Sequence, residues 1–232
     1  MPSESDSAQR RITEFWSAVA TDYESHPGNT VPVGSAAYDR WTEMFRRLLG
    51  AAPCDVADLG TGTGFAASIA ASLGHRVVGI DLADGMLAVA GRQAIDRGLE
   101  VRWVKGDAVT PPLEEGSVDA ITCRHLIWTL RDAVEALKNW RKLLRPLGRV
   151  IAFDALRHWQ DPAVEPDPND FFGRYYTSCV QSRIPFMRIT SPTPLIEAFE
   201  NVGFSNVHAD FLPRSFAEDD PDARPYVLVA RR

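Results

Sequence analysis

A glycine-rich turn is the feature of this sequence that most directly suggests a chemical function. Residues 56–65 read VADLGTGTGF, an apolar stretch followed by glycines at 60, 62 and 64 and then by a helix-like segment. Glycine permits positive φ and lets a ligand approach bare backbone. The helix that follows offers unpaired N–H groups and a partial positive charge at its N-terminus. The turn is therefore expected to favour an anionic ligand group such as a carboxylate.

The spacing of these glycines differs from that of dinucleotide-binding proteins. Their fingerprint is G-x-G-x-x-G after a strand, and the position of its third glycine is Phe65 here. The spacing disfavours NAD without forbidding it.

Two acidic residues follow the next two strand-like segments. Asp81 ends VVGID, and Asp107 follows VRWVKG. Ligands of doubly wound sheets bind outside the C-terminal ends of the strands, where Asp81 can accept both hydroxyls of a ribose and Asp107 an adenine amino group. The alternatives are a helix N-cap for Asp81 and a loop cap for Asp107. Asp84 is also a candidate N-cap, which would free Asp81 for a ligand.

The elements that must position these residues alternate between strand and helix from residue 55 onwards. Such alternation predicts an α/β fold with a doubly wound, mostly parallel sheet. A last helix and two last strands follow, and their short connection predicts an antiparallel C-terminal hairpin. The expected strands are Asp55–Leu59, Arg76–Ile80, Glu100–Lys105, Val118–Cys123, Arg149–Phe153, Ser205–Phe211 and Tyr226–Ala230, and the helices are Phe65–Leu73, Asp84–Arg97, Arg131–Leu144 and Thr193–Val202.

Two further segments are expected to cover the sheet within a single domain, 1–232. Residues 1–50 predict an N-terminal helical cap with two helices, the second beginning after Ser35, and residues 155–190 predict a lid insertion with a helix-like middle at 169–181. Ligand pockets are largely apolar and aromatic, so some aromatic residues of these segments are expected to face a substrate. The alternative is that most of them pack the lid onto the sheet. The substrate candidates are Trp16, His158, Tyr175 and Tyr176.

Composition restricts the class of protein. The chain has 232 residues, 45% of them hydrophobic, and a formal net charge of -6. A nucleic-acid binder would usually show a basic excess, so a nucleic-acid partner is not expected. The sequence has no apolar run of membrane-spanning length, and its three scattered cysteines suggest neither a disulfide framework nor a metal site. We expect a cytoplasmic protein, monomeric or homodimeric, with no membrane partner.

Together, these motifs resemble the class I S-adenosylmethionine-dependent methyltransferases of the bacterial small-molecule type. The resemblance covers about residues 55–154, through DLGTGTG at 58–64, Asp81-Leu82, GDA at 106–108 and LLRPLG at 143–148. The opening Phe15-Trp16 with Tyr23 also fits, because a tyrosine in such a segment closes over the cofactor in many members. Thr61 replaces a frequent cysteine, and Leu147 stands where a glycine is usual.

The resemblance implies a seven-stranded sheet with the last strand antiparallel, and S-adenosyl-L-methionine as cofactor. It implies that Gly60 and Gly62 line the methionine part, Asp81 the ribose, and Asp107 with Ala108 the adenine. Leu82 and Met86 are expected to pack against the adenine or to belong to the core. The predicted cofactor-binding residues are Tyr23, Asp58, Gly60, Thr61, Gly62, Asp81, Leu82, Met86, Asp107, Ala108 and Arg124.

The implied activity is methyl transfer to a small molecule, by O- or N-methylation, with secondary metabolism as a candidate setting. His125 follows the fourth strand, where the sulfonium end should lie, and an imidazole titrates near neutrality. It is therefore the candidate general base, with a role in orienting the substrate as the equal alternative. A non-catalytic S-adenosylmethionine-binding protein and an NAD-dependent reductase remain the alternative functions.

Overall fold

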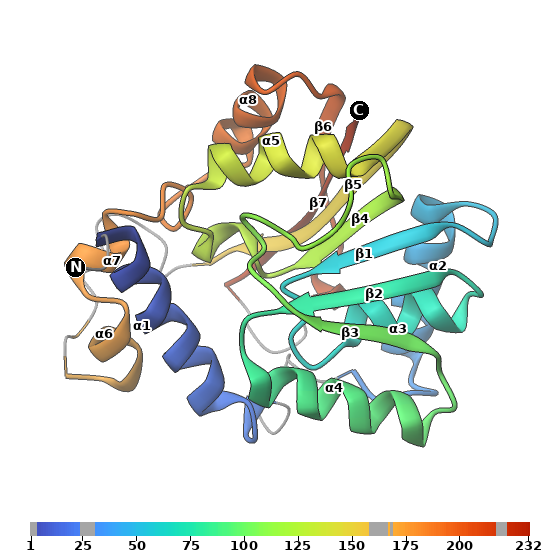
Figure 1. The fold of residues 1–232 in the computed structure, drawn as a ribbon, viewed down its shortest axis with the longest axis horizontal. Coiled ribbons are helices and arrows are strands. Elements are labelled where there is room, and N and C mark those ends of the chain that lie inside the picture. Colours follow the sequence, from blue (N-terminus) through green and yellow to red (C-terminus); the bar gives the residue numbers. More distant parts are fainter. Residues whose placement is uncertain (1–3, 24–30, 158–166, 168, 217–221) are drawn as a thin grey trace.

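A seven-stranded sheet runs through the middle of the protein (Figure 1). This computed structural model describes residues 4–23, 31–157, 167, 169–216 and 222–232. The strand order is β3-β2-β1-β4-β5-β7-β6, and β7 is antiparallel to both of its neighbours, β5 and β6. The strands are β1 Asp55–Leu59, β2 Arg76–Asp81, β3 Val101–Lys105, β4 Val118–Arg124, β5 Leu144–Leu156, β6 Ser205–Phe211 and β7 Arg224–Arg231. The predicted doubly wound, mostly parallel sheet with an antiparallel C-terminal hairpin is confirmed.

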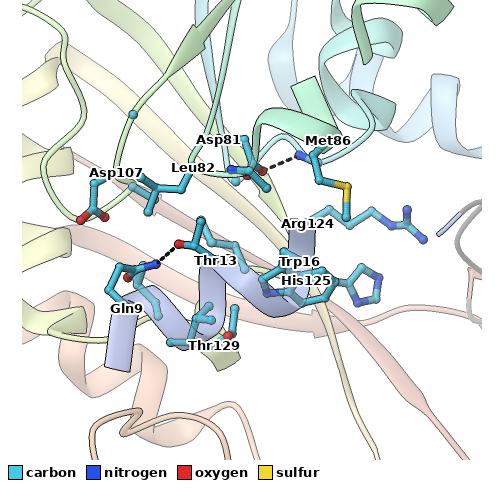
Figure 2. Close-up of a pocket in the computed structure, with 18 of the residues that line it drawn as sticks. Gln9, Thr13, Trp16, Asp81, Leu82, Met86, Asp107, Arg124, His125 and Thr129 are labelled. Carbon is cyan, nitrogen blue, oxygen red and sulfur yellow. Dashed lines mark hydrogen bonds between the residues drawn. The ribbon is translucent and has the colours of Figure 1, made fainter. Parts of the chain in front are cut away.

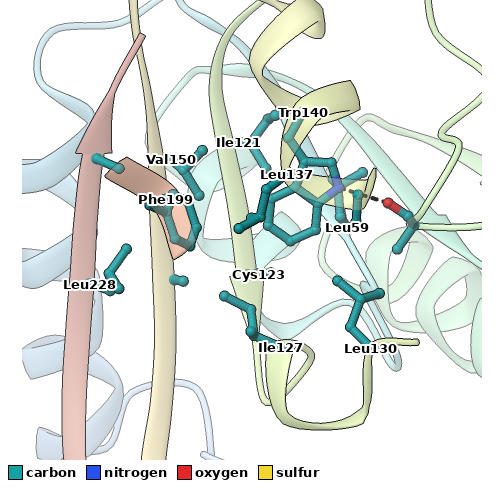
Figure 3. Close-up of a cluster of buried hydrophobic side chains, with 14 of the residues drawn as sticks. Leu59, Ile121, Cys123, Ile127, Leu130, Leu137, Trp140, Val150, Phe199 and Leu228 are labelled. Carbon is teal, nitrogen blue, oxygen red and sulfur yellow. Dashed lines mark hydrogen bonds between the residues drawn. The ribbon is translucent and has the colours of Figure 1, made fainter. Parts of the chain in front are cut away.

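Helices cover both faces of this sheet. The longer described helices are α1 Glu4–Val19, α2 Ala36–Leu49, α3 Phe65–Ser72, α4 Asp84–Asp96, α5 Ala133–Leu143 and α8 Thr193–Asn201. Side chains of α5 and α8 pack with alternate strand residues in one buried cluster, in which Trp140 and Phe199 are fully buried (Figure 3). Side chains of α2 and α3 form a second cluster on the other face, around Phe45 and Phe153. The alternation of strand residues between two apolar faces is typical of a parallel sheet that is buried on both sides.

The fifth strand begins earlier than the sequence predicts. Leu144, expected as the last residue of a helix, pairs with Val118 of β4, and a register shift follows between Val118 and Ala120. Leu147 lies in this stretch with a φ of 66° and is 79% exposed. The predicted start of this strand at Arg149 was therefore wrong, because the strand also includes Pro146 and Gly148.

Two predictions about helix starts have different outcomes. Ser35 caps α2 as expected, and its side chain accepts a hydrogen bond from the Tyr38 N–H. The prediction of Asp84 as an N-cap was wrong. Ala83 occupies the N-cap of α4 without a side-chain bond, and Asp84 forms an ion pair with Lys105 at 2.6 Å.

A small helical unit stands beyond the C-terminal ends of the parallel strands (Figure 1). We call α1, α6 (Phe171–Tyr175) and α7 (Ser178–Gln181) the cap; they share a buried cluster that includes Ile12 and Tyr176. The boundary predicted for the N-terminal cap needs correction, because α2 packs against α3 and the sheet. The expected helix at 169–181 is two short helices. None of the helices in the described part of the chain is both long and apolar enough to cross a membrane.

Candidate active site

A cavity lies between α1 and the C-terminal ends of the strands (Figure 2). It receives residues from the loops after β1, β2, β3 and β4 and from one face of α1. This is the place where ligands bind in doubly wound sheets. Its lining residues are Gln9, Ile12, Thr13, Trp16, Tyr23, Gly60, Gly62, Asp81, Leu82, Ala83, Met86, Gly106, Asp107, Ala108, Arg124, His125, Leu126, Thr129 and Leu130.

The glycine turn after β1 forms one wall of this cavity. Gly60, Gly62 and Gly64 have φ values of 59°, 55° and 86°, a region that other residues rarely adopt. A Cβ on Gly60 would lie 2.6 Å from Leu126 Cδ1, whereas a Cβ on Gly62 would meet no atom within 4 Å. Gly60 thus accommodates Leu126, and Gly62 faces open space. The Thr61 N–H donates to the Ile80 carbonyl at 3.0 Å, which ties the turn to β2.

Asp58 is 1% exposed and lies beneath this turn. Its carboxylate accepts hydrogen bonds from the hydroxyls of Thr61 and Thr122, at 2.5 and 2.7 Å, and from the Ala67 N–H at 3.2 Å. Burial raises the pKa of Asp58 to about 6, against the opposing effect of these bonds. The geometry gives Asp58 a role in holding the turn to β4 and α3. It lines a smaller cavity that adjoins the main one, and its contact with a cofactor stays a prediction.

Asp81 lies at the edge of the main cavity with its carboxylate already engaged. One oxygen accepts from the Gly62 N–H at 2.9 Å and the other from the Ala83 N–H at 2.9 Å. Burial raises the pKa of Asp81, and these backbone bonds oppose that rise. Asp81 therefore joins the glycine turn to the start of α4. A carboxylate has further lone pairs for ligand hydroxyls, so the predicted ribose role is compatible with the capping role.

Asp107 is similarly held by its own loop. One oxygen accepts from the Val109 N–H at 2.8 Å, which is the loop-cap alternative, and the other pairs with Arg131. Arg131 also donates to the Gln9 side chain on α1 at 2.7 Å, so this arginine connects the β3 loop to the cap. The neighbouring Ala108 is buried at the cavity wall.

The segment after β4 brings two cationic side chains and a histidine together. Arg124 lies over the rings of Phe65 and Trp41, with its guanidinium carbon 4.6 and 5.5 Å from their centroids. Arg157, just beyond β5, donates from Nη2 to Nδ1 of His125 at 2.5 Å. Burial, Arg157 and Arg124 hold the pKa of His125 well below its usual range. A lowered pKa makes the imidazole a weaker base, and the catalytic role of His125 stays a prediction.

Some aromatic residues in or next to the cap helices line the cavity, and others are buried in the core. Trp16 and Tyr23 line the cavity as predicted, whereas Tyr175 and Tyr176 do not. Tyr176 is fully buried, and its hydroxyl contacts the Trp16 Nε1 at 3.1 Å and the Thr129 hydroxyl at 2.5 Å. The predicted substrate contact of Tyr176 is thus replaced by lid packing, which was the alternative. His158 lies outside the described residues.

The remaining predicted residues lie where the sequence places them. Leu82 and Met86 line the cavity, and Met86 also packs against Ala20, which follows α1. Sequence reasoning missed Gln9 and Thr13, which line the cavity from α1. Both fall on the helix face of Ile12 and Trp16, so polar residues on an otherwise buried stripe were the available signal.

Part of the chain matches a family of known proteins. Residues 57–163 match the model of a methyltransferase domain. A demethylmenaquinone methyltransferase of Thermus thermophilus is 36% identical over 138 residues, 59% of this chain and 59% of that protein. The chain thus spans less than two thirds of this curated relative.

Solved structures share the fold at low sequence identity. A Haemonchus contortus phosphoethanolamine N-methyltransferase 2 superposes with a TM-score of 0.72 at 17% identity, covering 95% of this chain and 60% of that one. The [4+2]-cyclase SpnF superposes with a TM-score of 0.67 at 17% identity, covering 100% of this chain and 97% of that one. Because the second protein is named for a different reaction, the shared fold does not determine an activity.

Proposed function

We propose that the protein transfers a methyl group to a small molecule, because residues 57–163 match a methyltransferase domain and the family is that of the class I, S-adenosylmethionine-dependent enzymes. The acceptor is methylated on oxygen or nitrogen. The proposal rests on one observation. Gly60, Gly62, Asp81 and Asp107, which follow neighbouring strands, line the same cavity.

The described residues fit S-adenosyl-L-methionine. Open space at Gly62 leaves room for a ligand against the backbone, and Arg124 lies near the N-terminus of α3, where an anionic group is favoured. The carboxylate of Asp81 keeps lone pairs for two hydroxyls after its backbone bonds. Gly62, Asp81 and Arg124 would hold the methionine and ribose parts, and Asp107 with Ala108 the adenine.

When bound, the cofactor supplies a methyl group on a positively charged sulfur. The chain contributes position and exclusion of water, because a displacement of this kind needs the two reactants held in line in a dry site. Trp16 and Ile12 of α1 and Leu126 of the β4 loop provide apolar cover. The aromatic and aliphatic lining suits an acceptor with an apolar body, and the Thermus relative is named for such a substrate, demethylmenaquinone.

The experiment begins with isothermal titration of S-adenosylhomocysteine and, separately, of NADH. Binding of the first but not the second supports the methyltransferase, and the reverse result supports the reductase. Formation of S-adenosylhomocysteine from S-adenosylmethionine is then measured with hydroquinones, carboxylic acids and amines. Cofactor binding without turnover of any acceptor class would favour the non-catalytic binding protein.

A further inference from the structure

His125 is built into a chain of polar side chains that begins in the sheet and ends at the cavity. Arg157 donates to His125 Nδ1 at 2.5 Å, and Arg157 Nη1 lies 3.4 Å from Oδ1 of Asp154. The Asp154 side chain is 4% exposed and that of Arg157 17%, whereas the His125 side chain is 24% exposed and lines the cavity. The order from interior to cavity is carboxylate, guanidinium, imidazole.

This arrangement determines which ring nitrogen of His125 carries the proton. A guanidinium is always protonated and only donates. Nδ1 must therefore be the acceptor, and a neutral imidazole then bears its hydrogen on Nε2. The second proton of an imidazolium would have to sit on Nδ1, in place of the bond from Arg157. His125 thus presents an N–H donor at Nε2.

The surrounding charges strengthen this donor. Arg157 and Arg124 lie close enough to lower the pKa of the His125 ring, and Oδ1 of Asp154 lies 3.8 Å from Nδ1. Tyr226, opposite Asp154 on β7, is buried with a raised pKa and adds no charge. An N–H group polarised by a neighbouring cation prefers an anionic acceptor.

We propose that His125 Nε2 and the cations behind it bind the methyl acceptor through an oxyanion, either an ionised phenolic or enolic hydroxyl or a carboxylate. This inference rests on the proposed function and specifies its substrate class. The site binds an acceptor that is already ionised, so it requires no proton acceptor among the described residues. An ammonium or amine acceptor is disfavoured, because it would bring a donor or a positive charge toward an N–H and two arginines.

The arrangement at His125 is tested first without any ligand. Nitrogen-15 NMR of the full chain, with His125→Asn used for assignment, should show a neutral ring with hydrogen on Nε2 between about pH 6 and pH 8. Asn suits this position because His125 has a φ of 56°, which Asn tolerates. A ring with hydrogen on Nδ1, or an imidazolium at about pH 7, would overturn the proposal.

The substrate class is tested by binding to protein saturated with S-adenosylhomocysteine. The probes are 4-nitrophenol, 4-nitrobenzoate and 4-nitrobenzylamine, with 4-nitroanisole as the form that cannot ionise. We expect saturable binding of the phenol or the benzoate, with bound 4-nitrophenol showing the absorbance of its phenolate. The better binder of the two identifies the source of the oxyanion. Preferred binding of the amine, or no saturable binding of either oxyanion, overturns the proposal.

Variants separate this site from a general loss of structure. His125→Asn and Arg157→Met should each weaken oxyanion binding by roughly tenfold or more, the usual effect of losing a hydrogen bond to a charged group. Binding of 4-nitroanisole should change little, and Arg92→Met, in α4 and outside the cavity lining, serves as control. Unchanged oxyanion affinity in a folded His125→Asn protein overturns the proposal. If S-adenosylhomocysteine does not bind, the proposed function fails, while the NMR experiment still decides the arrangement of His125.

Discussion

Asp58 belongs to a ligand-binding motif, but its hydrogen bonds hold the glycine turn in place. The sequence places it beside the glycines and predicts a contact with the cofactor. In the structure its two oxygens accept three hydrogen bonds from β4, α3 and the turn. A buried carboxylate is stable only when it is hydrogen-bonded, and here those bonds fix the backbone that a ligand would approach.

The stability of the protein should therefore depend on the protonation of Asp58. Burial raises the pKa of Asp58 in the folded state to about 6 from 3.8, so the folded protein holds this proton more tightly than the unfolded chain. The resulting stabilisation is complete below the unfolded pKa and is lost as pH rises through about 6, with a slope of up to ~1.4 kcal/mol per pH unit.

Replacing Asp58 with Asn should remove this dependence. An Asn oxygen can accept the bonds from Thr61 and Ala67, and its amide can donate to the Thr122 hydroxyl, so the fold should persist. Urea unfolding of both proteins between about pH 4 and pH 7 isolates the contribution of Asp58, because all other titrating groups are shared. A difference in unfolding free energy that stays constant across this range would contradict the raised pKa.

The glycine turn allows a comparison at matched backbone strain. Gly62 and Gly98 have φ values of 55° and 63°, and a Cβ on either would meet no atom within 4 Å. Replacement by Ala should therefore destabilise both proteins by a similar amount, about 1–2 kcal/mol.

Only the Gly62→Ala change should affect the ligand. Gly62 lines the cavity, and Gly98 lies after α4 outside it. We expect S-adenosylhomocysteine affinity, measured by calorimetry, to fall by roughly tenfold or more in Gly62→Ala and to change little in Gly98→Ala. Equal losses of affinity would show that the turn is not the ligand wall.

At the scale of elements, the helix boundaries that were predicted correctly depend on local sequence. The predictions that were wrong depend on contacts between segments distant in sequence. The predicted limits of α3 and α4 lie at or near glycines, Gly64, Gly74 and Gly98. These positions could be recognised because the positive φ that they adopt is a local requirement. The early start of β5 depends on the pairing of Leu144 with Val118, which no local pattern reveals. The assignment of α2 to the sheet face depends likewise on where its apolar stripe finds a partner.

The hydroxyl of Tyr176 connects α1 to the segment that follows β4. It contacts Trp16 of α1 and Thr129 of the 3-10 helix Ile127–Thr129. Tyr176→Phe keeps the ring stacking but leaves a buried hydroxyl and an indole N–H without this partner. Leaving such a buried polar group without a partner lowers stability by about 1–3 kcal/mol. We therefore expect faster hydrogen exchange in α1.

A neighbouring tyrosine provides the control for this variant. Tyr175 is half-buried and packs against Phe15 and Phe171 through its ring. Tyr175→Phe should leave exchange in α1 close to that of the unchanged protein. If both variants open α1 equally, ring packing rather than the hydroxyl holds the helix.

At the scale of the whole molecule, the sequence predicted where the site lies better than what each residue does there. Strand ends in a parallel sheet meet at one edge by necessity, so Asp81 and Asp107 were found from order alone. The roles of His125 and Asp58 depend on partners distant in sequence, Arg157 and Thr122. A donor tautomer or a raised pKa is a property of such contacts, and no spacing rule encodes it.

The protein is divided into a well-packed sheet and a cap with fewer connections to it. Two large clusters bury the strands between helices, whereas the cap shares one small cluster to which the β4–α5 segment contributes Trp128. Regions with few buried apolar contacts open at lower free energy than the global core. Without ligand, α1, α6 and α7 should therefore exchange their amide hydrogens faster than β1 and β4.

Ligand binding should change this order in a specific way. Four residues of α1, Gln9, Ile12, Thr13 and Trp16, line the cavity, so a bound ligand adds contacts to α1 directly. A ligand that binds only the folded state also raises global stability, and α8, which contributes no residue to the cavity lining, reports that general effect. On adding S-adenosylhomocysteine, mass-spectrometric hydrogen exchange should show a larger gain of protection in α1 than in α8. A smaller gain should follow in α6 and α7, because both pack against α1. Equal protection of α1 and β4 in the free protein would mean that the cap is part of the rigid core. The same gain of protection in α1 and α8 would mean that the cap does not respond specifically to the ligand.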